Sequence, residues 1–216
     1  MQSGALMLVS PNLPIGSFSY SQALESAVEN GLVTSEEDFS KWLEDNLRHS
    51  LVKNDLPLLI RLYRSTNKEE FLSWTNQVIA LRTTKEFRSE ERDKGKALTR
   101  LIESLDFKVD KDFLNIAKES YLAAFVLFGK AKQVNINDIL YAYTFSYIEA
   151  ICICAIKLVP LGQTSAWRII ENKSKLIDDL VKKASLIEDD LIGTGLFNLA
   201  IQSVLHETLY SRIFRS

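Results

Sequence analysis

Two histidines are the side chains in this sequence best suited to acid–base or metal chemistry. His206 is followed directly by Glu207, so this pair could bind a metal ion or transfer a proton. The HExxH spacing of zinc peptidases is absent, because Tyr210 stands where the second histidine would be required. His49 lies near the end of a predicted helix, where an imidazolium suits the carbonyl dipole. We therefore expect a structural or docking role for His206 and Glu207, with a metal-dependent helical enzyme as the weaker alternative.

Two aspartate pairs also deserve a test against known chemistry. Asp178–Asp179 and Asp189–Asp190 resemble the paired carboxylates with which helical isoprenoid enzymes hold Mg²⁺, but the next turns supply no third acidic ligand. The sequence also lacks the GxxxxGK[ST] pattern of a phosphate-binding loop. The residues alone therefore favour a binding or scaffold protein over an enzyme, with no catalytic residue, no metal ligand and no tightly bound cofactor.

The first candidate for a binding surface is the stretch SPNLPIGSFSYSQALE near the N-terminus. Phe18 and Tyr20 lie there beside a turn that contains Pro14 and Gly16. One interpretation is a hydrophobic staple that closes the first helix. The other is a partner-binding surface, and we carry both residues forward as candidates for it.

The second candidate is a charged stretch, TKEFRSEERDKGKAL. On a helix, Arg88, Arg92 and Lys96 form one stripe at i, i+4 spacing. A solvated face of mixed charge is the favoured explanation of this pattern. The interleaved acidic residues argue against DNA or RNA as the ligand, so Arg88 and Arg92 remain candidates for a protein partner.

The third candidate is the C-terminal tail, residues 210–216. Its aromatic and arginine side chains are of the kinds enriched at interface centres, namely Tyr210, Arg212, Phe214 and Arg215. A chain end is more often frayed and polar. We therefore expect this tail to bind a partner and to become ordered on contact with it.

The element that must position these residues is the run Ile139–Ile156. It carries one formal charge, Glu149, and its apolar residues fall on every side of a helical wheel. Such a helix must be buried, in the middle of a bundle or against a second copy. It is short for a membrane span and contains polar residues such as Thr144, which favours a soluble core helix. We predict a buried central helix at about 137–157, ended by Pro160.

Cys152 and Cys154 both lie within this helix. At i and i+2 they point to nearly opposite sides, so they can neither pair with each other nor share one metal ion. They are therefore interpreted as small core residues in a reducing cytosol. No segment has the pattern of a secretory signal, so we expect a cytoplasmic protein.

The composition favours helices throughout the chain. Only 8 glycines and 4 prolines occur in 216 residues, which is few for the many turns of a β fold. We predict an all-α, single-domain helical bundle of about 8–10 helices over residues 1–216. Residues 1–16 should form an irregular N-terminal segment because of Pro11, Pro14 and Gly16. One helix should run from Asp110 through Phe128, one from the PLGQT turn to about Leu186, and the last should start at Gly193–Gly195. A net charge of −2 gives no general attraction to nucleic acid or to an anionic membrane.

Four motifs together carry a family resemblance. SPNLPIGSFSYSQALESAVENGLV, TKEFRSEERDKGKAL, IKLVPLGQT and HETLYSRIFRS resemble, in this order, the UreF family of urease accessory proteins. The similarity spans the chain from about Met7 to Ser216. Ala23 is a departure, since the family usually has glycine there, and Lys85 stands where arginine is frequent.

The resemblance implies an all-α, non-enzymatic maturation factor. Members of the family act as homodimeric scaffolds that join the accessory protein UreD (also called UreH) and the GTPase UreG, so that nickel reaches apo-urease. The scaffold modulates the GTPase step, with GTP on the partner and nickel handled by the complex. Candidate interface or gating positions are then Lys157, Gln163, His206 and Glu207. A helical adaptor for another GTPase complex is the alternative.

Overall fold

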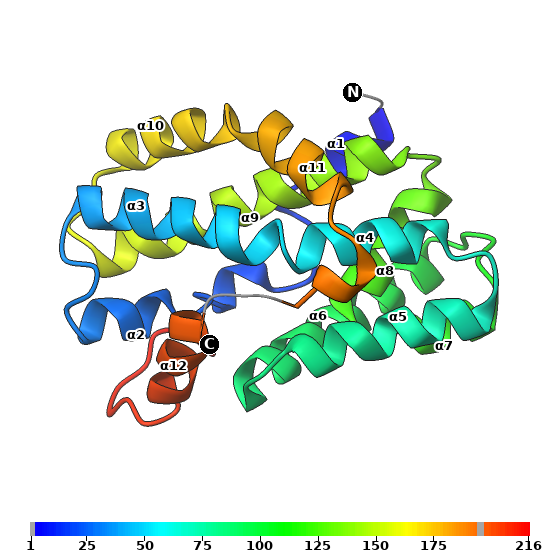
Figure 1. Cartoon of the computed structure of the whole chain (residues 1–216), viewed down its shortest axis with the longest axis horizontal. Coiled ribbons are helices and arrows are strands. Elements are labelled where there is room, and N and C mark those ends of the chain that lie inside the picture. The colour runs from blue at the N-terminus through cyan, green and yellow to red at the C-terminus, as the bar shows by residue number, and fades with distance from the viewer. Residues whose placement is uncertain (1–2, 194–196) are drawn as a thin grey trace.

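The computed structural model describes residues 3–193 and 197–216, and these residues form helices and no strand. The α-helices are α1 (Ser3–Leu8), α2 (Leu24–Glu29), α3 (Glu36–Asn46), α4 (Asp55–Arg64), α5 (Lys68–Leu81), α6 (Lys85–Ser104), α7 (Lys111–Ala117), α8 (Tyr121–Ala131), α9 (Ile136–Leu158), α10 (Gln163–Ser174), α11 (Ile177–Ser185) and α12 (Phe197–His206). Shorter turns are η1 (Ser17–Ser19), η2 (Leu47–Leu51) and η3 (Asp189–Leu191). The predicted all-α fold is confirmed (Figure 1).

Helix α9 is the central helix that the sequence predicts at about 137–157. It begins after Asn135, whose side chain accepts a hydrogen bond from the backbone N–H of Asp138. Helices α1, α2, α4, α10 and α11 all pack against α9 (Figure 1). It is long and apolar enough to span a membrane, but 56% of its most apolar window is buried inside this chain, as in a soluble core helix. One side remains open, since Ile153 is 40% exposed.

Helix α8 is the second apolar centre, and α4, α6 and α7 pack around it. Helix α6 approaches the start of α8 so closely that a Cβ on Gly95 would lie 2.8 Å from the carbonyl carbon of Ser120. At this crossing the Glu91 carboxylate accepts hydrogen bonds from the Ser120 hydroxyl at 2.8 Å and from the Leu122 N–H at 2.9 Å. A carboxylate at the N-terminus of a helix is favourable because the free N–H groups and the helix dipole lie there.

Three predicted boundaries need correction. The segment 1–16 is irregular only in part, because Ser3–Leu8 forms α1 and buries Ala5 and Leu8, ahead of the first proline. The helix expected from Asp110 through Phe128 is divided at Ser120, whose side chain caps α8. The helix expected from the PLGQT turn to about Leu186 is two helices, α10 and α11. The described residues therefore form more helices, and shorter ones, than expected. The expected start of the last helix falls partly on residues 194–196, which lie outside the described residues.

Cys152 and Cys154 are buried free cysteines, as expected. Burial raises the pKa of each thiol to about 12. Both thiols are therefore protonated at neutral pH and serve as small core side chains.

Candidate functional site

The C-terminal tail is docked on its own chain. The Arg215 N–H donates to the Ser19 carbonyl at 2.8 Å, and the Ser21 N–H and hydroxyl both donate to the Ser216 carbonyl at 2.6 Å. Phe214 is only 4% exposed, and the Lys157 ammonium lies 5.5 Å from the centre of its ring. The tail is thus packed on its own chain here, whereas the sequence predicts ordering on contact with a partner, and partner binding by the tail stays a prediction. Phe214 is a core residue of its own chain, and exposed Lys157 covers it.

A buried cluster of Glu25, His206 and Glu86 lies beneath the tail, and we call it the carboxylate–imidazole cluster. His206 on α12 is fully buried. Its Nδ1 lies 2.8 Å from Oε2 of Glu86 on α6, and its Nε2 lies 2.8 Å from Oε2 of Glu25 on α2. The cluster therefore joins three helices whose sequence positions are far apart.

Both carboxylates of this cluster also hold the tail. Glu25 accepts hydrogen bonds from the backbone N–H groups of Ile213 at 2.6 Å and Phe214 at 3.0 Å. The Arg212 guanidinium lies 2.8 Å from Oε1 of Glu86. Burial raises the pKa of Glu86, and the charges of His206 and Arg212 oppose this effect. The predicted interface residue His206 is thus an internal anchor of the tail, whereas Glu207 is exposed.

The loop before α2 adopts a constrained backbone conformation. Gln22 and Ala23 have φ of 54° and 66°, in the left-handed region that favours glycine. This conformation agrees with the glycine that the family resemblance implies at the position of Ala23. The side chain of Gln22 donates to the Glu90 carboxylate, which also accepts from the Ser216 hydroxyl. The strained loop and the chain end are therefore joined through α6.

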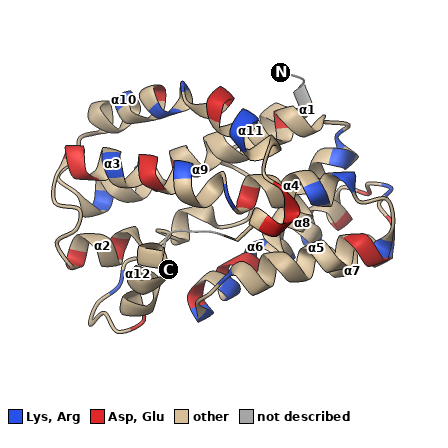
Figure 2. Ribbon diagram, viewed as in Figure 1, with Lys and Arg blue, Asp and Glu red and all other residues tan. Residues whose placement is uncertain are grey.

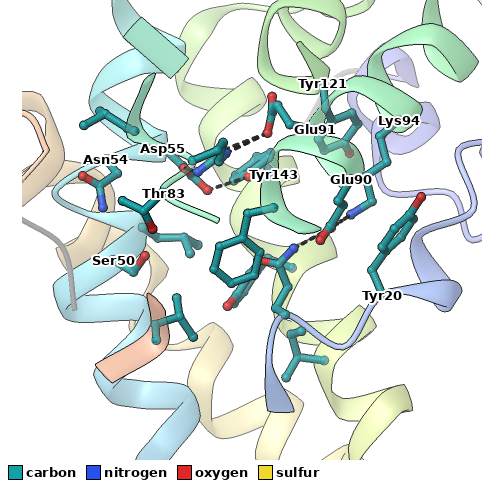
Figure 3. Close-up of a pocket in the computed structure, with 18 of the residues that line it drawn as sticks. Tyr20, Ser50, Asn54, Asp55, Thr83, Glu90, Glu91, Lys94, Tyr121 and Tyr143 are labelled. Carbon is teal, nitrogen blue, oxygen red and sulfur yellow. Dashed lines mark hydrogen bonds and ion pairs between the residues drawn. The ribbon is translucent and has the colours of Figure 1, made fainter. Parts of the chain in front are cut away.

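A cavity of about 270 Å³ is lined by residues of α4, α6, α8 and α9 and by the start of α12, including Phe197 (Figure 3). Tyr20 lines this cavity and is 5% exposed, with the Lys94 ammonium 5.1 Å from its ring centre. Burial raises the pKa of Tyr20. The prediction of Tyr20 as a surface residue is therefore wrong, since this side chain packs against α6 and leaves only its neighbour Phe18 exposed.

An ion network forms the opposite wall of the cavity (Figure 3). The Arg82 guanidinium lies 2.8 Å from Asp55 and 2.9 Å from Glu91, and the Tyr143 hydroxyl donates to Asp55 at 2.8 Å. Burial opposes ionisation of Glu91, but the charge of Arg82 prevails and lowers its pKa. The network joins α4, α6 and α9 and has a structural role.

The predicted charged stripe on α6 is mostly engaged within the chain. Arg88 donates to the Arg82 carbonyl at 2.7 Å, and Arg92 lies 3.1 Å from the Glu119 carboxylate. Gln163 is exposed at the first residue of α10. These positions agree with a solvated face of mixed charge on α6, and Arg92 and Gln163 remain accessible.

The residues of the enzyme alternative do not converge. His206 is buried with two glutamates, Asp179 pairs with Lys183, and Asp189 pairs with Arg61. Among residues 3–193 and 197–216, no group of three or more His, Cys, Asp or Glu side chains is placed to hold a metal ion.

The outer side of α12 is an exposed apolar surface, which we call the α12 apolar face. Its residues fall on one side of the helix at i, i+4, i+7 and i+8, and they are Phe197, Ile201, Val204 and Leu205. Phe197 is 81% exposed, and exposed Tyr210 and Ile213 of the tail follow in the chain. Helix α12 contains no Lys, Arg, Asp or Glu residue (Figure 2). Its inner side instead buries His206, so the carboxylate–imidazole cluster fixes the α12 apolar face in place.

Comparison with known proteins gives a consistent result. The UreF family model matches residues 33–172. The urease accessory protein UreF of Enterobacter sp. (strain 638) is 37% identical over 214 residues, which cover 98% of this chain and 96% of that protein. The protein of the same name from Alcanivorax borkumensis is 36% identical and covers 97% of this chain and 95% of its own length. This chain therefore belongs to the UreF family of urease accessory proteins.

Proposed function

We propose that this chain is a non-enzymatic scaffold in urease maturation. It joins a UreD-like (UreH-like) accessory protein and a UreG-like GTPase, so that nickel reaches apo-urease, and it modulates the GTPase step. Family membership supports the role in urease maturation. The observation that carries the scaffold proposal is the α12 apolar face, together with the exposed tail residues Tyr210 and Ile213.

The α12 apolar face has the properties of a docking site. Its apolar side chains face solvent in the isolated chain, although burying each of them is worth about 1.5–3 kcal/mol. Tyr210, which is exposed beyond the end of this helix, is of a residue type enriched at hot spots of binding energy. Because the carboxylate–imidazole cluster and the docked tail already hold α12, a partner would lose little ordering entropy on binding. We assign this face to the UreD-like partner.

In this proposal the GTP is bound by the partner GTPase and the nickel is handled by the complex. The sequence contains no phosphate-binding loop, so GTP would be bound by the UreG-like partner. Nickel is the cargo of the complex, and this chain holds no tightly bound cofactor in the proposal. Lys157, Gln163 and Arg92 are accessible candidates for contacts with the GTPase.

The proposal includes a homodimer in the cytoplasm. Ile153 on α9 and Trp167 on the neighbouring helix α10 are exposed, Trp167 by 64%, and a second copy would cover them. Lys and Arg residues are interspersed with Asp and Glu residues over several of the helices (Figure 2). This mixed distribution supports protein partners rather than nucleic acid or a membrane surface.

Co-purification tests the docking assignment. A double variant, Phe197→Ser with Ile201→Ser, should lose at least about tenfold in capture of the UreD-like partner, since two apolar contacts are removed. The matched control is Leu72→Ser with Leu105→Ser, which changes two exposed apolar residues on α5 and at the end of α6. Circular dichroism should remain helical for both proteins. Equal capture by both variants would refute the assignment.

A further inference from the structure

We propose that two copies of this chain pair through α9 about a two-fold axis at Ile153, with Glu149 of each copy bound to Lys157 of the other. This arrangement rests on the homodimer of the proposed function and names the residues that specify it. Lys157 is thereby assigned to the second copy, and Arg92 and Gln163 remain candidates for the GTPase contact.

One ridge of α9 is left open by the rest of the chain. Glu149, Ile153 and Lys157 follow one another at i, i+4 spacing, and side chains in such rows form the ridges with which helices pack. Ile153 is 40% exposed, and Phe145 and Ile156 on the same side of the helix are half-buried. Apolar side chains that remain open on a largely buried helix are stabilised when a further helix covers them.

Glu149 is a half-buried carboxylate that has no cation in its own chain. Within the part of the chain that the structure describes, it accepts no hydrogen bond and forms no ion pair. Burial alone raises its pKa. A carboxylate that loses water without gaining a partner is unfavourable, so a cation from another chain would stabilise it.

Lys157 is the matching cation, about two turns further along the same ridge. Its ammonium lies 5.5 Å from the ring centre of Phe214, which holds it on this side of the helix, and no carboxylate of the described residues pairs with it. Glu149 and Lys157 each lie about 6 Å from Ile153 along the helix axis, because a helix rises about 1.5 Å per residue. The ridge therefore carries opposite charges at equal distances from its exposed isoleucine.

Charge and symmetry together select the orientation of the two helices. In a two-fold dimer the same patch of both copies meets, so that residue i contacts residue j and j contacts i. Parallel α9 helices would bring Glu149 against Glu149 and Lys157 against Lys157, and like charges across an interface are strongly unfavourable. Antiparallel helices with the axis at Ile153 bring each Glu149 to a Lys157. Two ion pairs then flank a central contact between the two isoleucines.

The position of the axis is tested with Ile153→Cys in the full-length chain. Side chains that meet at the axis are close enough for a disulfide, so oxidised glutathione should convert most of this variant to a covalent dimer. Leu72→Cys is the matched control, because Leu72 is 44% exposed but lies on α5, which packs against α4, α7 and α8. Cys152 and Cys154 are buried and protonated, so they do not compete. No covalent dimer in Ile153→Cys, or an equal yield in Leu72→Cys, overturns the arrangement.

The ion pairs are tested by charge reversal, with dimer dissociation constants measured by analytical ultracentrifugation at low salt. Glu149→Lys alone and Lys157→Glu alone each set like charges against each other at both pairs, so each should weaken the dimer at least about tenfold. The double variant restores opposite charges and should return to within about threefold of the wild type. Glu69→Lys reverses an exposed charge on α5 and should leave the dissociation constant unchanged.

The outcomes separate this arrangement from the proposed function. Single variants as tight as the wild type, or a double variant as weak as the single ones, overturn the ion pairs and leave the homodimer standing. Circular dichroism checks that each variant keeps the helical fold, and Glu149→Gln, which removes the charge without reversing it, should weaken the dimer less than Glu149→Lys. A monomeric wild type overturns both the homodimer and this arrangement. Failure of the contact with the UreD-like partner would be seen separately in co-purification.

Discussion

Replacing Phe214 with alanine should release the C-terminal tail without unfolding the helical bundle. Phe214 is 4% exposed, its ring lies under the Lys157 ammonium, and its backbone N–H donates to Glu25. Truncation of a buried phenylalanine to alanine costs about 3–5 kcal/mol. Residues 210–216 follow α12 and belong to no helix, so they can detach while the helices stay packed. The cost should therefore appear in the docking equilibrium and only slightly in the melting temperature.

The magnitude can be measured directly. About 3 kcal/mol corresponds to roughly a hundredfold change in an equilibrium, since each factor of ten is about 1.4 kcal/mol. We expect Phe214→Ala to accelerate removal of Ser216 by a carboxypeptidase by about that factor, because Ser216 is buried while the tail is docked. The control is Ile213→Ala, which changes a neighbouring side chain that is 64% exposed and should have little effect. Equal release rates for Phe214→Ala and the wild type would show that Phe214 does not hold the tail.

Three further outcomes follow from buried groups. Arg82→Met should lower the free energy of unfolding in urea by about 3–5 kcal/mol, because Asp55 and Glu91 would stay buried without their cation; an unchanged unfolding midpoint would contradict this. Burial acts to raise the pKa of Glu91, but the charge of Arg82 outweighs burial and the pKa is lowered. The ionised Glu91 therefore stabilises the fold above the ordinary glutamate pKa of about 4.3, and this stabilisation is lost as pH falls below that value. Glu91→Gln should therefore reduce the slope of unfolding free energy against pH in this acidic range, and an equal slope would argue against the assignment. Cys152 and Cys154, with pKa values raised to about 12, should resist iodoacetamide at about pH 8 in the native protein and react in urea, as mass spectrometry can show.

The parts of the fold that the sequence predicts well depend on local interactions. The continuous apolar run predicts α9 to within a residue or two at each end. Ser35, Asn67, Asp110 and Asn135 cap helices, and such signals are local because a cap bonds to N–H groups only two or three residues away. The family resemblance also rests on short motifs and is confirmed by the relatives.

The candidate site could not be assembled from the sequence because its members are distant in the chain. Glu25, Glu86 and His206 belong to three different helices, and each is an isolated ionisable residue in an ordinary amphipathic pattern. The tail shows a second limit. Its alternating aromatic and arginine residues predict that apolar groups are buried, but the same pattern fits burial against this chain or against a partner. The sequence therefore suggests a partner contact for Phe214, whereas the structure buries Phe214 in the core of its own chain.

The positive φ of Ala23 is a further case. The resemblance implies a glycine there, and the backbone gives a physical reason, since the loop turns through the left-handed region just before α2. Tyr20, two residues after exposed Phe18, turns inward at the same loop. Sequence proximity therefore groups two aromatic residues that the fold separates.

The scaffold claim is tested most directly by size-exclusion chromatography with light scattering, with the chain alone and then with a UreD-like protein and a UreG-like GTPase loaded with GTP. We expect a homodimer for the chain alone and one larger particle that contains all three proteins. The Phe197→Ser, Ile201→Ser variant should keep the dimer and lose the larger particle. A chain that elutes as a monomer and shifts with neither partner would contradict the scaffold proposal.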